Sequence, residues 1–130
     1  SALGITQLVK NDKGVVRRNE IASNYKKAFQ DKIKFQSLPK GMYNAHHLFV
    51  IEVEDRKGLY DFLRLHNIYA QIHYIPVHTM PYYKSIGYIE AGLKESEDYY
   101  SKCISLPMYP NLTEKEQDFV IEKVNSYIYG

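Results

Sequence analysis

The segment at residues 46–54, His-His-Leu-Phe-Val-Ile-Glu-Val-Glu, restricts the fold more than any other part of the sequence. Successive side chains of a β-strand point to opposite faces, so one face of this segment carries Phe49 and Ile51. The other face carries Leu48 and Val50. Because both faces are apolar in the first part of the segment, we expect a central strand.

Helical patterns lie on either side of this strand. Apolar residues recur near helical spacing over residues 3–30, with polar residues between them, which predicts a long N-terminal helix. Gly14 is the weak point of this helix, because glycine costs about 1 kcal/mol relative to alanine in a helix interior. Asp55 is placed to cap a second helix at about 56–66, and Asn67 is suited to a left-handed turn after it.

The C-terminal half of the sequence predicts two more strands and two more helices. Strands are expected at 69–75 and 104–106, with a short helix at 95–102 between them. Thr113 and Glu116 have the spacing of a capping box at the start of a last helix. The fold class is therefore α+β, with a small three-stranded sheet covered on one side by helices and a long N-terminal helix.

Composition excludes several classes of function. The 130 residues include 17 lysines and arginines and 15 aspartates and glutamates, and the net charge of +2 is too small to predict binding to nucleic acid or to an anionic membrane. There is no apolar run of about 18 residues that could cross a membrane. Cys103 is the only cysteine, which fits a reducing, cytoplasmic location and predicts a buried structural thiol rather than a nucleophile.

The main candidate site is the motif His73-Tyr-Ile-Pro-Val-His78, which precedes a second proline at Pro81. Three interpretations are open: polar side chains at a strand end, a metal site, or a loop that faces a polar ligand. A metal is disfavoured, because no carboxylate or cysteine lies at a helpful spacing. The density of imidazole and phenol groups between two prolines favours the ligand-facing loop, because Pro76 and Pro81 fix its backbone.

Four parts of the chain, in this order, resemble the DegT/StrS group of sugar-nucleotide aminotransferases. They are Ala2-Leu-Gly-Ile-Thr-Gln-Leu with Arg17-Arg-Asn-Glu-Ile-Ala, then His47-Leu-Phe-Val-Ile, then Ile72-His-Tyr-Ile-Pro-Val-His with Pro81-Tyr-Tyr, and finally Glu97 and Tyr100 with Ile104-Ser-Leu-Pro-Met and Leu112-Thr. The family usually has glycine where this chain has Asn67, and asparagine tolerates the same left-handed turn. The Ser-Leu-Pro ending and the doubled tyrosine resemble the branch that aminates C4 of UDP-linked 4-keto-6-deoxy sugars in pseudaminic acid synthesis.

The resemblance implies the C-terminal small domain of a fold-type I enzyme that depends on pyridoxal phosphate. Residues 1–30 would be the helix that leaves a missing large domain, and 31–130 the small α+β domain. The family's Schiff-base lysine and phosphate-binding residues lie upstream, so we expect no catalytic, cofactor-binding or metal-binding residues in this chain, no bound cofactor and no activity of the fragment alone. His73, Tyr74 and His78 would bind the substrate.

The parent reaction implied by the resemblance is transfer of an amino group, from glutamate, to a nucleotide-linked keto sugar. The family forms homodimers mainly through the large domain, so we expect this fragment to be a monomer or a weak, non-native dimer. An alternative function is a stand-alone, non-catalytic binding or assembly module with the same small-domain fold.

Overall fold

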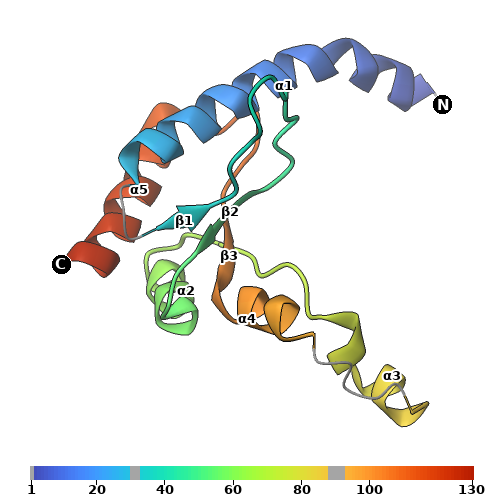
Figure 1. Ribbon diagram of the computed structural model, residues 1–130. Helices are drawn as coiled ribbons and strands as arrows, with labels where there is room; N and C mark the ends of the chain where they lie inside the picture. Colours follow the sequence, from blue (N-terminus) through green and yellow to red (C-terminus); the bar gives the residue numbers. More distant parts are fainter. Residues whose placement is uncertain (1, 30–32, 88–92) are drawn as a thin grey trace.

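The fold is built around a three-stranded antiparallel sheet with a long helix across it (Figure 1). A computed structural model describes residues 2–29, 33–87 and 93–130. The elements, in chain order, are α1 (Ala2–Ala28), β1 (Lys34–Phe35), β2 (Phe49–Glu52), α2 (Arg56–Leu65), the 3-10 turn η1 (Val77–Thr79), α3 (Pro81–Ser85), α4 (Lys94–Lys102), β3 (Cys103–Leu106) and α5 (Glu114–Tyr129).

The sheet order is β1-β2-β3, which confirms β2 as the central strand. Phe49 pairs with Leu106 and Ile51 pairs with Ile104 across the β2–β3 ladder, so these four apolar side chains share one face. All four are buried. The alternation within β2 therefore determines which face of the sheet meets the core.

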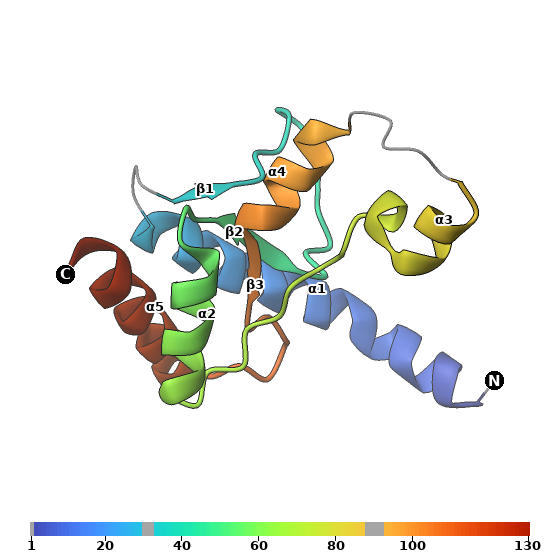
Figure 2. The same cartoon turned by 90° about the horizontal axis from the view of Figure 1, so that it is seen from below.

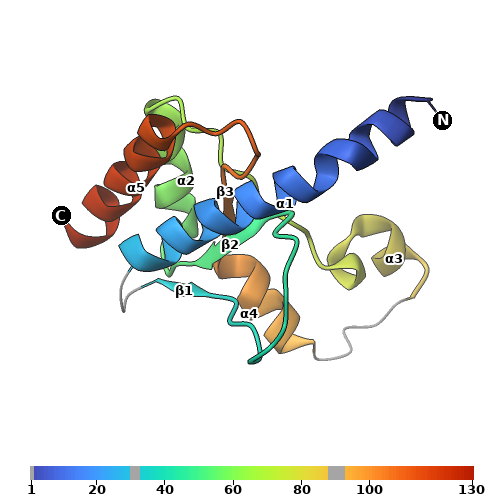
Figure 3. The ribbon, with the colours of Figure 1, turned by 90° about the horizontal axis from the view of Figure 1, so that it is seen from above.

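Helices α1, α2 and α5 cover the core face, and α1 runs across the sheet in Figure 3. Tyr25 of α1 lies on Phe49, with 5.0 Å between the ring centroids, and its hydroxyl donates to the carbonyl oxygen of Pro107. Helix α4 packs against β2 from the opposite face (Figure 2), where Tyr99 and Val50 line the same hollow. The helices therefore cover both faces of the sheet rather than one.

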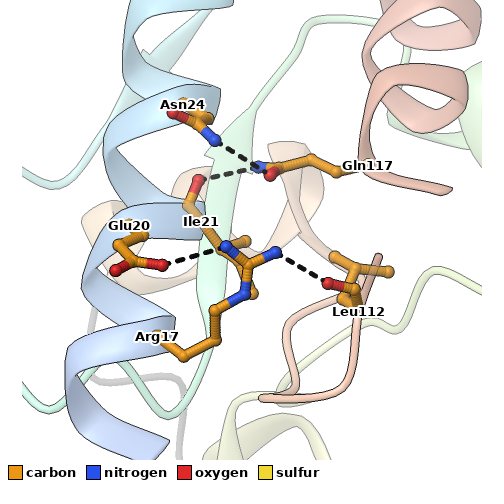
Figure 4. A network of polar contacts seen from close by, with 6 residues as sticks. All are labelled: Arg17, Glu20, Ile21, Asn24, Leu112 and Gln117. Atoms are coloured by element: carbon orange, nitrogen blue, oxygen red, sulfur yellow. Dashed lines mark hydrogen bonds and ion pairs between the residues drawn. The ribbon is translucent and has the colours of Figure 1, made fainter. Parts of the chain in front are cut away.

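A polar network joins α1 to α5 and to the turn before it (Figure 4). The buried Gln117 amide donates to the carbonyl oxygen of Ile21 at 2.8 Å, and its oxygen accepts from Asn24 at 3.3 Å. Arg17 donates to the carbonyl oxygen of Leu112 at 2.9 Å and also pairs with Glu20. The second half of α1 is thereby fixed to the body, while its first half projects beyond it with exposed apolar side chains (Figures 1 and 3).

The predicted helix ends are confirmed. The Asp55 carboxylate accepts from the backbone N–H of Gly58 at the start of α2, and Asn67 has φ 58° after its end. Both bonds of the capping box between Thr113 and Glu116 are present. Each cap supplies a partner to backbone groups that a helix terminus would otherwise leave free.

Several predictions about the backbone are wrong. The predicted strand at 69–75 is reduced to a single bridge between Gln71 and Ser105, beyond which the chain leaves the sheet. The third strand is instead β1, a two-residue strand that the sequence pattern does not predict. Residues 76–81, predicted as a loop, contain η1 and the start of α3. The predicted long N-terminal helix is confirmed as α1, which continues through Gly14 without a break, and its predicted end at residue 30 lies outside the described residues.

Candidate functional site

The candidate site lies on a segment that leaves the edge of β3 and projects away from the sheet. We call residues 72–86 the arm; it ends in η1 and α3, which lie far from α5 in Figure 1. The arm exposes an unusual number of large apolar and aromatic side chains for so short a segment: Tyr74, Ile75, Val77, Tyr82 and Ile86. Large exposed apolar surface of this kind marks a contact surface.

The base of the arm is fixed to β3 at His73. Just before it, Gln71 and Ser105 exchange two backbone hydrogen bonds, at 3.0 Å and 2.8 Å. The Nδ1 atom of His73 lies 3.0 Å from the Ser105 hydroxyl oxygen. The Cys103 thiol donates to the carbonyl oxygen of His73 at 3.5 Å. Ring and backbone of His73 are therefore both held by side chains of one strand, and the ring itself is only partly covered.

Tyr74 is the most exposed side chain among the predicted site residues. It is 75% exposed, and its ring centroid lies 4.7 Å from that of His73. The structure thus brings His73 and Tyr74 together as one imidazole–phenol pair on the surface of the arm. Such a pair can donate hydrogen bonds and also offer a ring face to a ligand.

His78 lies in a different environment. Its side chain is buried, at 8% exposed, and its Nε2 atom lies 2.8 Å from a carboxylate oxygen of Glu97 on α4. The adjoining turn is closed by Thr79, whose backbone N–H and hydroxyl both donate to the carbonyl oxygen of Pro76. His78 therefore attaches the far end of the arm to α4, and within the described residues no hydrogen bond or ring contact joins it to His73.

Two partners of these histidines were not identified as such from the sequence. Ser105 and Glu97 both belong to motifs that carried the family resemblance, but neither was assigned to a histidine. Ser105 lies 32 residues from His73, and Glu97 lies 19 residues from His78. Their presence in the motifs of the resemblance could have marked Ser105 and Glu97 as site residues. Which histidine each of them contacts can be seen only in the folded structure.

The thiol beneath His73 is a structural group, as predicted. Cys103 is fully buried, and burial raises the pKa of its thiol, which keeps the sulfur protonated as a donor to His73. A raised pKa is the opposite of what a cysteine nucleophile needs. Within the described residues, no group of three or more His, Cys, Asp or Glu side chains is arranged to hold a metal ion.

A concave surface, separate from the arm, lies between the first half of α1 and the turn before α5. It has a volume of about 700 Å³ and is lined by Lys10, Lys13, Arg17, Arg18 and Tyr109, among others. A pyridoxal cofactor needs a lysine for its imine, a partner for the pyridinium nitrogen and a phosphate site. The walls of this open cavity include lysines but no carboxylate, so the residues present do not fit that cofactor. No helix in the described part of the chain is long and apolar enough to cross a bilayer.

Comparison with known proteins assigns the chain to a family. The model of the DegT/DnrJ/EryC1/StrS aminotransferase family matches residues 1–125. The chain is 35% identical, over its whole length, to the spore coat polysaccharide biosynthesis protein SpsC of Bacillus subtilis, and covers 36% of that protein.

Solved structures agree in sequence and in fold. A DegT DnrJ EryC1 StrS aminotransferase from Brucella abortus is 32% identical with a TM-score of 0.87, over 97% of this chain and 34% of that one. PseC of Helicobacter pylori, an aminotransferase involved in the biosynthesis of pseudoaminic acid, is 30% identical with a TM-score of 0.84, over 96% of this chain and 35% of that one. The chain thus spans about a third of the length of these relatives. On the match over residues 1–125, it belongs to the DegT/DnrJ/EryC1/StrS aminotransferase family.

Proposed function

We propose that this chain is the C-terminal small domain of a pyridoxal phosphate-dependent enzyme that transfers an amino group from glutamate to a nucleotide-linked keto sugar. The family match over residues 1–125 is the observation that carries this proposal. In it, residues 1–30 are the helix that connects the small domain to a large domain, and residues 31–130 are the small domain. The first half of α1 exposes several apolar residues, and such a face is unfavourable in water. This exposure supports the proposal that another domain packs against α1 in the complete enzyme.

The proposed substrate is a UDP-linked 4-keto-6-deoxy sugar that is aminated at C4. Its support is the likeness to PseC at 30% identity, together with the Ser-Leu-Pro ending of β3 and the doubled tyrosine. On this proposal the enzyme belongs to the route to pseudaminic acid and acts in the cytoplasm. The parent protein is a homodimer, and the 130-residue chain alone is a monomer or a weak, non-native dimer.

The cofactor is held by residues outside this chain in the proposed enzyme, and the chain alone binds none and is inactive. When bound, the cofactor stabilises the carbanion of the transfer reaction. In this proposal the small domain binds and orients the sugar nucleotide, and we assign this role to His73, Tyr74 and His78. His73 donates to a hydroxyl or diphosphate oxygen, the exposed ring of Tyr74 forms a pocket wall, and His78 holds the arm in place through Glu97.

The test is steady-state kinetics of the full-length enzyme with His73→Ala. We expect KM for the sugar nucleotide to rise, or kcat to fall, by tenfold or more, which corresponds to about 1.4 kcal/mol of transition-state stabilisation. His66→Ala is the matched control, since His66 lies at the end of α2 and contacts the carbonyl oxygen of Phe62. Kinetics of His73→Ala within twofold of the wild type would contradict the assignment.

A further inference from the structure

The contact between His73 and Ser105 restricts where the imidazole proton can lie. Ser105 is 3% exposed, and its backbone N–H and carbonyl are both used by Gln71. Its hydroxyl lies 3.0 Å from Nδ1 of His73, and this is the one contact of that hydroxyl that the described residues provide. The hydroxyl can donate only one hydrogen bond, and its residue is almost completely buried.

Two hydrogen-bond directions are chemically possible at this distance. If Nδ1 of His73 carried the proton, it would donate to the Ser105 oxygen, and the buried hydroxyl hydrogen would have no acceptor in the described part of the chain. If the hydroxyl donates to Nδ1 instead, both groups are satisfied. Because a buried polar hydrogen without a partner is penalised, the second arrangement is favoured.

We propose that Ser105 is a positioning residue that holds His73 in the tautomer with its proton on Nε2, so that the ring donates a hydrogen bond to an oxygen of the bound ligand. The identity of that ligand rests on the proposed function above. The acceptor is a hydroxyl, carbonyl or phosphate oxygen, and a ligand that offers only a donor at this point is rejected. In this arrangement His73 binds and orients, and it is not a base that removes a proton through Nε2.

The same strand also fixes the position of the ring. Cys103 and Ser105 are two residues apart and lie on one face of β3. The first holds the carbonyl oxygen of His73 and the second holds its ring. Rotation of the ring would break the contact with the serine. A donor held at two points loses less freedom when a ligand binds than a free side chain would.

Two other histidines of the chain can serve as internal references when the tautomer of His73 is measured by NMR. The Nδ1 atom of His66 lies 2.8 Å from the carbonyl oxygen of Phe62, which can only accept, so His66 carries its proton on Nδ1. The Nε2 atom of His78 faces the Glu97 carboxylate, which accepts in the same way, so His78 carries a proton on Nε2. The same spectrum thus contains histidines of both kinds, and the His66 signal also reports whether a variant is folded.

The first experiment is a two-bond ¹H–¹⁵N correlation spectrum of the 130-residue chain near neutral pH, with His73 assigned by its loss in His73→Gln. We expect an unprotonated Nδ1 and a protonated Nε2 for His73, opposite to His66. Ser105→Ala should shift His73 toward a mixture of tautomers, and Ser105→Thr, which keeps the hydroxyl, should restore the wild-type pattern. Ser101→Ala removes a hydroxyl that contacts Asp98 on α4 and should change nothing. A proton on Nδ1 in the wild type, or no change in Ser105→Ala while His66 is unaltered, would overturn the proposal.

The second experiment separates this inference from the proposed function. In the full-length enzyme, Ser105→Ala should raise KM for the sugar nucleotide about three- to tenfold, the range for loss of one ordered hydrogen bond, with Ser105→Thr close to wild type. If His73→Ala impairs the enzyme while Ser105→Ala does not, the positioning role is refuted and the proposed function stands. If both variants match the wild type, the assignment of His73 to the substrate fails as well.

Discussion

Replacement of Gln117 tests the packing of α1 on α5 most sharply. This side chain is 1% exposed, and it lies between two helices that are far apart in the sequence. Its amide donates to the carbonyl oxygen of Ile21, and its oxygen accepts from Asn24 (Figure 4). The change Gln117→Ala removes both hydrogen bonds and leaves the Asn24 amide without this partner.

The expected cost follows from these contacts. Each intramolecular hydrogen bond contributes about 1 kcal/mol net. Truncation also removes one buried methylene, worth about 0.8 kcal/mol. We therefore expect Gln117→Ala to lower the free energy of unfolding by about 3 kcal/mol, and the melting temperature by roughly 10 °C for a chain of this size.

The assay is urea denaturation of the 130-residue chain, followed by circular dichroism. Asp118→Ala is the matched control, because Asp118 is the exposed neighbour on the same helix and its removal should change stability by less than about 0.5 kcal/mol. Gln117→Glu keeps the shape but cannot donate to Ile21 when ionised, so it should also destabilise at neutral pH and recover in part at acid pH. A loss below about 1 kcal/mol for Gln117→Ala would refute the reasoning.

Two further predictions concern the start of α2. Gly58→Ala should destabilise the chain, although alanine normally favours a helix by about 1 kcal/mol, because its methyl group would collide with the Tyr127 hydroxyl and the Asp55 carboxylate. Gly14→Ala, whose methyl group would lie 3.4 Å from the nearest side-chain atom, should stabilise instead, and melting temperatures of the two variants with the same sign would contradict this account. The Tyr127 hydroxyl and the Gly58 N–H hold the pKa of Asp55 below its usual 3.8, so the stability they confer is present above that pH and is lost as the pH falls through the lowered pKa. Tyr127→Phe should therefore lose less stability than the wild type between about pH 4 and pH 2 in urea titrations, and an unchanged slope would argue against the contact.

The parts of the fold that were predictable are those encoded by local chemistry. The Asp55 cap, the left-handed Asn67 and the capping box of Thr113 with Glu116 each need only a few neighbouring residues, and all three are present. The central position of β2 followed from apolar side chains on both of its faces. Side-chain alternation and capping require no knowledge of distant parts of the chain.

The wrong and missing elements depend on contacts between distant residues. Residues 69–75 have the β-branched and aromatic composition of a strand, but only Gln71 finds a partner in β3, after which the chain leaves the sheet edge to form the arm. Strand β1 has two residues and exists because β2 offers a free edge to Lys34 and Phe35. Composition cannot identify a strand that short, because its pairing is set by the tertiary structure.

In the candidate site, too, some features follow from local sequence and others depend on contacts between distant residues. The sequence predicted a ligand-facing segment around His73, Tyr74 and His78. It did not predict the contact between the His73 and Tyr74 rings, because neighbouring side chains of the expected strand would point to opposite faces. The separate burial of His78 against Glu97, and the contact of His73 with Ser105, come from the packing of the arm on α4 and β3. The role of these residues toward a substrate stays a prediction.

The most direct test of the central claim is a single-turnover reaction of the full-length enzyme. The enzyme carrying the aminated form of the cofactor would be mixed with a UDP-linked 4-keto-6-deoxy sugar, and the return of the aldehyde form would be followed by absorbance. We expect conversion with this sugar nucleotide and regeneration of the aminated form by glutamate. Conversion with simple 2-oxo acids but with no nucleotide-linked keto sugar would contradict it.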